Sequence, residues 1–188
     1  RAKDLVKRIL MFSRRSEPEQ KPMLISPVVL ESLKLLRASL PTTIDIRKKV
    51  GTIKDAIYGD ATQIHQILMN LCTNAGHAMR EAGGILEVEV FRQDIREEDT
   101  DFLVNLAPGP YICILVRDTG HGMSPDILER IFEPYFTTKV KGEGTGLGLS
   151  VVHGIVRNHN GDITVESEPG RGTTFKVYFP VIQNVRTD

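Results

Sequence analysis

Apolar residues recur every three or four positions in several segments of the chain, and this period predicts amphipathic helices. The predicted helices cover residues 1–15, 26–40, 147–158 and a long segment from Asp60 to the Gly83-Gly84 stop, with a short one at 125–131. Ser26 and Pro27 resemble an N-cap and a first-turn proline. Asp60 and Gln63 have the spacing of a capping box, which marks the start of the long helix.

Five other segments alternate apolar and polar residues or form short apolar runs, as strands do. They cover residues 43–50, 85–91, 111–118, 162–168 and 173–179, and the turn "PGRG" joins the last two. Strands and helices do not alternate regularly, so we predict an α+β fold: a two-layer sandwich in which a mixed β-sheet carries helices on one face.

The first segment differs from the others because its apolar seam has no partner in the first thirty residues. A seam of this kind suits a coiled coil or a helical bundle. "SEPEQKP" (16–22) has the prolines and charges of a linker. We therefore predict two parts: the end of a dimerisation helix with its linker (1–21) and a main domain (22–188). The chain begins without methionine, and we expect it to be a piece of something longer.

Composition narrows the possible functions. Lys and Arg number 24, equal to Asp and Glu, among 188 residues, so no net field favours nucleic acid or an anionic membrane. The longest uncharged runs fall short of the ~20 apolar residues that a membrane helix needs. The two cysteines, Cys72 and Cys113, lie in apolar runs, which favours buried thiols in a reducing compartment. We expect a cytoplasmic chain without nucleic-acid or direct membrane contact, although the full protein could be membrane-anchored.

The stretch "GEGTGLGLS" (142–150) has the glycine density of a loop that wraps phosphate. It is not a Walker loop, because no lysine follows the glycines. It is not the dinucleotide motif either, because the third glycine of that motif falls on Leu149.

Polar residues share one narrow arc of the long helix, about a third of a turn from its apolar stripe. They are Gln66, Asn70, Asn74 and His77. An asparagine oxygen is a hard ligand that suits a Mg²⁺ ion sharing phosphate oxygens. On this helix alone, solvated asparagines are an equally good interpretation.

Three further motifs are weak when taken singly. "VRDTGHGM" (116–123) ends a strand in Asp-x-Gly-x-Gly, which suits an exocyclic amine but is also a common turn. "IFEPYFTTKVK" (131–141) combines aromatic residues that could anchor a lid with Lys139 and Lys141, which could face phosphates. "GRGTTFKVYFP" (170–180) is a tight turn into a strand.

Together and in this order, the motifs resemble those of sensor histidine kinases. More broadly they resemble the GHKL ATP-binding (Bergerat) fold of type II topoisomerases, mismatch-repair ATPases and heat-shock chaperones. "HQILMNLCTNAGHAM" is similar to the asparagine box, "VRDTGHGM" to the first glycine box, "IFEPYFTTK" to the phenylalanine box and "GTGLGLS" to the second glycine box. The resemblance covers residues 26–180. Residues 1–15 also resemble the end of the dimerisation and phosphoacceptor hairpin.

The resemblance implies ATP and Mg²⁺ as ligands, with a role for each matching residue. Asn74 would bind Mg²⁺ with support from Asn70, and Lys139 would contact the γ-phosphate. Asp118 would accept the adenine amino group, and Gly120 and Gly122 would line the base and ribose. Thr173 would help to bind adenine through the aspartate and water. The phosphates would meet Gly144, Thr145, Gly146, Leu147 and Gly148. His77 departs from the lysine, arginine or glutamine common in these kinases, so its expected phosphate contact is weaker.

Asn70 implies a kinase within this fold, because ATPase branches carry a glutamate base there and asparagine has no usable basicity. None of the five histidines precedes Asp or Glu, so we expect the acceptor histidine upstream of Arg1. The implied partners are the chain's own upstream hairpin, in a homodimer, and a response-regulator receiver domain. Two alternatives remain: a serine kinase of the anti-sigma type, and a non-catalytic nucleotide-binding module of a signalling scaffold.

Overall fold

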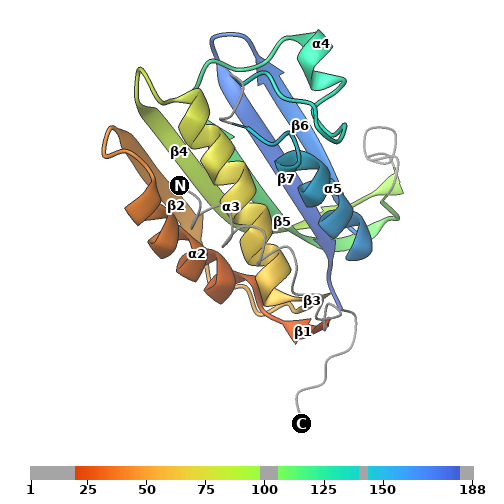
Figure 1. The fold of residues 1–188 in the computed structure, drawn as a ribbon. Coiled ribbons are helices and arrows are strands. Elements are labelled where there is room, and N and C mark those ends of the chain that lie inside the picture. The colour runs from red at the N-terminus through yellow and green to blue at the C-terminus, as the bar shows by residue number, and fades with distance from the viewer. Residues whose placement is uncertain (1–19, 98–105, 140–143, 183–188) are drawn as a thin grey trace.

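The computed structural model describes residues 20–97, 106–139 and 144–182. Their elements, in chain order and labelled as in Figure 1, are β1 (Lys21–Met23), α2 (Ile25–Ser39), β2 (Ile44–Val50), β3 (Ile57–Gly59), α3 (Ala61–Ala78), β4 (Gly84–Ile95), β5 (Gly109–Asp118), α4 (Pro125–Leu128), α5 (Gly148–Asn158), β6 (Asp162–Glu168) and β7 (Gly172–Pro180). The helix predicted at 1–15 lies outside the described residues.

The main sheet is mixed, as predicted. Its strand order is β2-β4-β5-β7-β6. Strands β2 and β4 are parallel, and every other neighbouring pair is antiparallel. The parallel pair needs a crossover, which passes through β3 and α3. Helices α2, α3 and α5 lie side by side over one face of the sheet (Figure 1), so the predicted α+β sandwich is confirmed.

The core fills the space between helices and sheet. On α3 the buried positions include Ile64, Ile67, Leu68 and Leu71, which keep the helical period. On the strands the period is two, and Leu86 and Val88 of β4 are fully buried. The two periods meet in one layer of apolar side chains. This layer holds α3 at a set distance from β5 and thereby places the polar arc of the helix.

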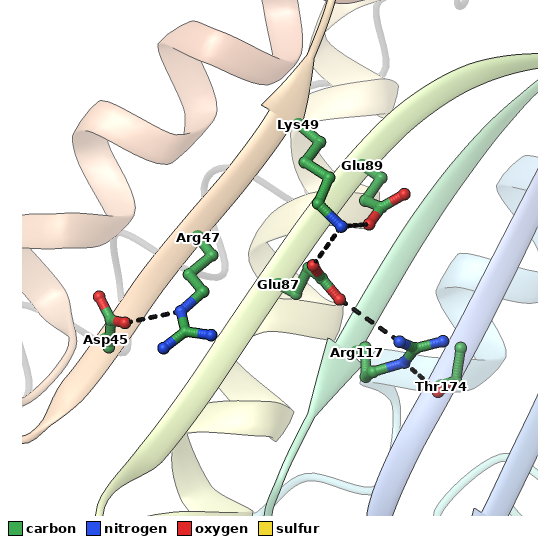
Figure 2. A network of polar contacts seen from close by, with 7 residues as sticks. All are labelled: Asp45, Arg47, Lys49, Glu87, Glu89, Arg117 and Thr174. Atoms are coloured by element: carbon green, nitrogen blue, oxygen red, sulfur yellow. Dashed lines mark hydrogen bonds and ion pairs between the residues drawn. The ribbon is translucent and has the colours of Figure 1, made fainter.

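The opposite face of the sheet carries charge instead of helices. Figure 2 shows a network of ion pairs and hydrogen bonds across β2, β4, β5 and β7, formed by Asp45, Arg47, Lys49, Glu87, Glu89, Arg117 and Thr174. Lys49 Nζ lies 2.9 Å from Glu87 and 2.6 Å from Glu89. The hydrogen bond from Lys49 lowers the pKa of Glu87. Ion pairs that involve an exposed side chain contribute little stability, so the network chiefly makes this face polar.

Two predicted helix starts differ in detail from the structure. Leu24 is the N-cap of α2, and Ser26 is not: its hydroxyl donates to Gly51 O at 2.8 Å. Asp60 does cap α3, accepting from the Thr62 N–H at 2.7 Å. The return half of the capping box is absent among the described contacts, because the Asp60 N–H donates to His159 Nε2 at 3.3 Å.

The sequence did not predict the small sheet formed by β1 and β3. These three-residue strands pair antiparallel, and Ile57 also bridges to Val181. Three residues are too few for a period to be recognised. Strand β4 runs to Ile95, four residues beyond its predicted end, and α4 is shorter than predicted. The boundary between residues 21 and 22 stays a prediction.

Candidate functional site

The candidate site lies where α3, the turn after β5 and the loop before α5 meet. Helices α3 and α5 run antiparallel, so the N-terminus of α5 faces the middle of α3. Gly148 is the contact point: a Cβ built on it would lie 2.9 Å from Asn70 Oδ1. The absence of a side chain at this glycine therefore allows the first turn of α5 to approach the asparagine arc.

The two asparagines of the arc have different partners. Asn70 Nδ2 donates to Gln66 O at 2.9 Å, within the helix. Asn74 Oδ1 accepts from Lys139 Nζ at 3.0 Å. Asn74 and Lys139 are 65 positions apart in the chain, and both are half-buried. Asn74, the predicted metal ligand, thus accepts a hydrogen bond from a cationic side chain that belongs to the predicted lid.

The N-terminus of α5 has no side-chain cap. Its N-cap is Leu147, which cannot accept a hydrogen bond through its side chain. The Thr145 hydroxyl accepts from the Leu147 N–H at a long 3.4 Å, before the helix begins. The first N–H groups of a helix have no partner within it, and they carry the positive end of its dipole. The end of α5 that faces the asparagines therefore favours an anion.

The loop before α5 is held against the segment that follows α4. The Tyr135 N–H donates to Gly146 O at 2.9 Å. Gly146 has φ +67°, and any side chain there would collide with the backbone of Tyr135. Tyr135 itself has φ +67° and is 76% exposed, which is unusual for a bulky residue. The sequence did not single out Tyr135, because Phe132 and Phe136 are aromatic residues of the same segment and the sequence alone does not distinguish the three.

Of the two phenylalanines near Tyr135 that were predicted to anchor a lid, Phe132 is packed against the core and Phe136 is not. Phe132 packs against the core, with its ring centroid 5.2 Å from that of His153 on α5. The guanidinium of Arg130 lies 4.4 Å from the centre of the Phe136 ring, a cation–π geometry. The contact of Phe132 ties this segment to the body of the domain, while the contact of Phe136 lies within the segment that leads to Lys139.

Asp118 is at the far side of the site, at the end of β5. It is only 5% exposed, and its Oδ1 accepts from the Gly120 N–H at 2.8 Å. Burial raises the pKa of Asp118, while hydrogen bonds from the backbone of Gly120 and Thr173 act in the opposite direction. A buried carboxylate with two backbone donors remains an acceptor for a further donor.

Glycines are required around Asp118 because the backbone is crowded there. A Cβ on Gly120 would lie 2.6 Å from the Cβ of Ala78, at the end of α3. Gly122 has φ +66° and faces the carbonyls of Glu168 and Gly172. Thr173 pairs with Asp118 in the register of β5 and β7. The turn after β5 is therefore pressed between α3 and the β6–β7 hairpin.

Ser167 is a further polar residue at this corner, and sequence reasoning missed it. Its hydroxyl lies 2.9 Å from Thr173 Oγ1 and donates to Gly172 O at 3.0 Å. It also accepts from the Met123 N–H at 2.9 Å. The sequence could have indicated Ser167 only through the predicted hairpin of β6 and β7, whose register places Ser167 opposite Thr173.

The predicted residues thus form two groups. The first contains Asn70, Asn74, Lys139, Gly146 and Gly148, and the second contains Asp118, Gly120, Gly122 and Thr173. Gly144 lies beside Thr137 and Lys139, next to the first group. His77 follows Asn74 on α3 and is half-buried. Among the residues described, no three His, Cys, Asp or Glu side chains are grouped so that they could hold a metal ion.

A family model described as "Histidine kinase-, DNA gyrase B-, and HSP90-like ATPase" matches residues 59–183. The chain is 37% identical over 191 residues to the sensor kinase CckA of Brucella abortus, covering all of this chain and 20% of that protein. It is 37% identical over 159 residues to the sensor histidine kinase ZraS of Salmonella typhimurium, covering 84% of this chain and 30% of that protein. The chain therefore spans less than a third of these relatives' length.

Solved structures agree with the sequence relatives. Full-length ShkA, in a crystal structure in complex with AMPPNP, superposes with a TM-score of 0.69 at 25% identity, over 96% of this chain and 36% of that one. The catalytic domain of the histidine kinase ThkA superposes with a TM-score of 0.65 at 25% identity, over 86% of this chain and 95% of that one. Within the described part of the chain, no helix combines the length and apolarity needed to cross a membrane.

Proposed function

The chain belongs to the family of histidine kinase-, DNA gyrase B-, and HSP90-like ATPases, and we propose that it is the ATP-binding catalytic part of a two-component sensor histidine kinase. In this proposal it transfers the γ-phosphate of ATP to a histidine that lies upstream of Arg1. A response-regulator aspartate receives the phosphate afterwards. The sequence relatives are named as sensor kinases, and they support this branch of the family.

The observation that carries the proposal is the contact between Lys139 and Asn74 beside the N-terminus of α5. A cation, an amide oxygen and an uncapped helix end come together from three segments of the chain. Triphosphate binding needs these elements: positive charge for the γ-phosphate, backbone N–H groups for the other phosphates, and a hard oxygen for a divalent ion. Gly144, Thr145, Gly146, Leu147 and Gly148 would supply the backbone N–H groups.

The adenine end of the proposed site is the corner at Asp118. Its carboxylate would accept a hydrogen bond from the amino group of the base, with Gly120 and Gly122 lining the base and ribose. The ligand of the ShkA structure, AMPPNP, is an adenine nucleotide, which is consistent with this assignment. Because the carboxylate is already buried and oriented by backbone donors, it needs little reorganisation to receive the base.

The donor set fits a Mg²⁺ ion carried by the nucleotide. Asn74 Oδ1 already accepts a hydrogen bond from the ammonium group of Lys139. Its oxygen therefore points toward a positive charge. Mg²⁺ typically keeps several waters and takes one or two protein oxygens with the substrate phosphates. Asn74 would be the ligand, with Asn70 supporting it and His77 one turn further along the helix. When bound, the ion would neutralise charge on the transferred phosphate.

The proposed reaction is transfer to protein and not to water. Asn70 carries an amide where a glutamate base would activate water, and its Nδ2 is committed to Gln66 O. The chain's contribution is therefore positioning and charge neutralisation.

We expect Asn70→Glu to raise ATP hydrolysis several-fold, measured as ADP release, with Asn70→Gln as the control. Equal release by the two variants would contradict the absence of a base as the reason for transfer.

The acceptor and the partners belong to the same proposal. Upstream of Arg1 we place a dimerisation and phosphoacceptor hairpin, which would make the full protein a homodimer in the cytoplasm. Mixing this chain with a separately made hairpin and γ-labelled ATP should label the hairpin and, after addition of a receiver domain, the receiver. Label that remains on this chain alone would contradict an upstream acceptor.

Two alternative functions are distinguished by the labelling experiment and by a nucleotide titration. A serine kinase of the anti-sigma type would also bind ATP with Mg²⁺, but it would label a protein serine and leave the hairpin unlabelled. A non-catalytic scaffold module would bind the nucleotide weakly or not at all. Calorimetric titration of AMPPNP, with and without Mg²⁺, separates the scaffold from the two kinases. Absence of binding in both titrations would overturn the proposed function.

A further inference from the structure

Lys139 places a positive charge directly on the oxygen that is the proposed metal ligand. Its Nζ donates to Asn74 Oδ1 at 3.0 Å. An ammonium group has donors and no acceptor, so the atom of the Asn74 amide that faces it is the oxygen. Lys139 therefore fixes the orientation of this amide and, in the same contact, occupies a position beside its oxygen that a metal ion would need.

The side chain of Lys139 extends from the predicted phosphate loop to α3. A Cβ built on Gly144 would lie 3.0 Å from Lys139 Cδ and 3.3 Å from its Cβ, so the stem of the lysine passes the first glycine described in that loop. Lys139 lies outside helices and strands. Rotation about its flexible four-carbon stem can therefore move the ammonium away from Asn74 without a change in either helix.

A divalent ion and the Lys139 ammonium compete for the Asn74 oxygen. Mg²⁺ binds oxygen at about 2.0–2.1 Å, so an ion on the lone pair that faces Lys139 would take the place of the ammonium. An ion on the other lone pair would lie within about 5 Å of Nζ, where the two positive charges repel each other, more strongly in a half-buried site than in water. In both cases Lys139 must leave before Asn74 can bind the ion.

We propose that Lys139 reserves the metal position at Asn74 for nucleotides that carry a γ-phosphate. The inference rests on the proposed function and deepens it, because it concerns which nucleotide the same site takes together with Mg²⁺. A γ-phosphate attracts the Lys139 ammonium and draws it away from Asn74, whose oxygen then becomes available to the ion. A diphosphate has no such group, so the ammonium stays on Asn74 and opposes Mg²⁺ binding there.

The same exchange separates substrate from product. In the proposed transfer, the bond between the γ-phosphorus and the β–γ bridging oxygen breaks, a bond to an imidazole nitrogen of the acceptor forms, and the imidazole releases its N–H proton. ADP keeps the bridging oxygen, and Lys139 loses the anion that held it. The ammonium then returns to Asn74 and weakens the hold on ADP. Lys139 is thus a specificity-determining residue for the triphosphate.

The test compares how much Mg²⁺ strengthens the binding of AMPPNP and of ADP, with affinities measured by calorimetry in Mg²⁺ and in EDTA. For the wild-type chain we expect a gain of about 100-fold for AMPPNP and of no more than about threefold for ADP. Lys139→Met removes the charge at similar side-chain length and should raise the gain for ADP to about tenfold or more. The affinity for AMPPNP in EDTA should fall, because the γ-phosphate loses a cationic partner.

Further variants show whether Lys139 acts through Asn74. Lys139→Arg keeps the positive charge and should keep the small gain for ADP. Adding Asn74→Ala to Lys139→Met removes the oxygen, so the gain for ADP should disappear again. Lys176→Met is the matched control, because Lys176 lies on β7 and pairs with Glu166 of β6 on the face of the sheet that carries no helices. This control should keep both wild-type gains.

The proposed function and the inference fail through different results. A wild-type chain that binds neither nucleotide overturns the proposed function and, with it, the inference. Equal gains from Mg²⁺ for AMPPNP and ADP in the wild-type chain overturn the inference alone, and this comparison does not depend on the folding of any variant. A small gain for ADP that Lys139→Met leaves unchanged also overturns the inference.

Discussion

Helices α3 and α5 run antiparallel, and the two ends of this pair satisfy their polar groups in different ways. At one end, which we call the closed end, Asp60 and His159 join the start of α3 to the end of α5. His159 Nδ1 lies 2.8 Å from Ile155 O, and its Nε2 accepts from the Asp60 N–H at 3.3 Å. The ring is 3% exposed and meets Phe179 edge to face. Both of its nitrogens are therefore used within the fold.

At the other end, which we call the open end, Asn74, Lys139 and the N-terminus of α5 meet. Here the helix start has no side-chain cap, and an ammonium group contacts the amide oxygen of Asn74. Lys139 comes from a segment without helix or strand, whereas Asn74 lies within α3. One end of a single helix pair thus joins the two helices through a buried histidine, while the other end brings together the charged and polar groups that we propose bind the nucleotide.

The largest effect is expected at the open end. Asn74→Ala removes the proposed Mg²⁺ ligand, and we expect the affinity for AMPPNP with Mg²⁺ to fall about 100-fold or more. Calorimetry without Mg²⁺ should show a much smaller difference between variant and wild type. Thr62→Ala, an exposed change on the same helix near the closed end, is the control. A loss of affinity that does not depend on Mg²⁺ would contradict the assignment.

The closed end should respond in stability and not in binding. His159→Ala leaves the Asp60 N–H without its acceptor, removes the ring contact with Ile155 O and opens a cavity beside Phe179. We expect a loss of about 2–4 kcal/mol in the free energy of unfolding, measured with urea. Asn158→Ala, an exposed neighbour, should cost far less. AMPPNP affinity at a temperature where His159→Ala is folded should stay within about threefold of wild type; a larger drop would mean that the two ends are coupled.

Asp118→Asn should lower the affinity for AMPPNP without lowering the stability of the fold. We expect AMPPNP affinity to fall about thirtyfold, because an amide is a weaker acceptor than a carboxylate. Stability to urea at neutral pH should hold or rise, since the variant no longer desolvates a charge. Asp55→Asn, an exchange of the same kind outside the site, is the control. A fall in both quantities would show that Asp118 is needed chiefly for folding.

The pH dependence of the wild-type chain follows from the same residue. Burial raises the pKa of Asp118 in the folded state, so its proton binds more readily to the folded than to the unfolded chain. The charged carboxylate therefore lowers the free energy of unfolding at pH values above its pKa in the folded state. This cost disappears as the pH falls through that pKa. Nucleotide affinity changes in the opposite direction, because the ionised acceptor is lost over the same range. Affinity should begin to fall at a higher pH than an ordinary aspartate would give.

The smallest effect is expected from Gln63, near the closed end. Its Oε1 is the only buried side-chain N or O atom among the described residues that has no hydrogen-bond partner. Gln63→Met removes this atom at similar volume and should raise the free energy of unfolding by about 1 kcal/mol. The same exchange at Gln66, one turn further along, is the control. Unchanged stability would mean that water already satisfies the Gln63 oxygen.

Much of the fold could be predicted because its signals are local. The 3.6-residue period of Ile64, Ile67 and Leu71 indicated α3, and the two-residue period indicated β2 to within one residue. Helix α3 ends at Ala78, before the predicted stop at Gly83-Gly84. Strand β1 could not be predicted in this way, because it exists only through its pairing with β3. Ser26 has the local chemistry of a cap, yet its hydroxyl bonds to Gly51, which lies 25 positions away.

The sequence by itself determined the class of fold and named the candidate site residues apart from Ser167, because periods and motif spacings are carried by neighbours in the chain. The tertiary structure decided which of these residues meet. Lys139 reaches Asn74 across 65 positions, Asp60 reaches His159 across 99, and Ser167 faces Thr173 across a hairpin. Such contacts depend on how helices pack on the sheet and on strand register, and buried polar groups then take whichever partners this packing provides.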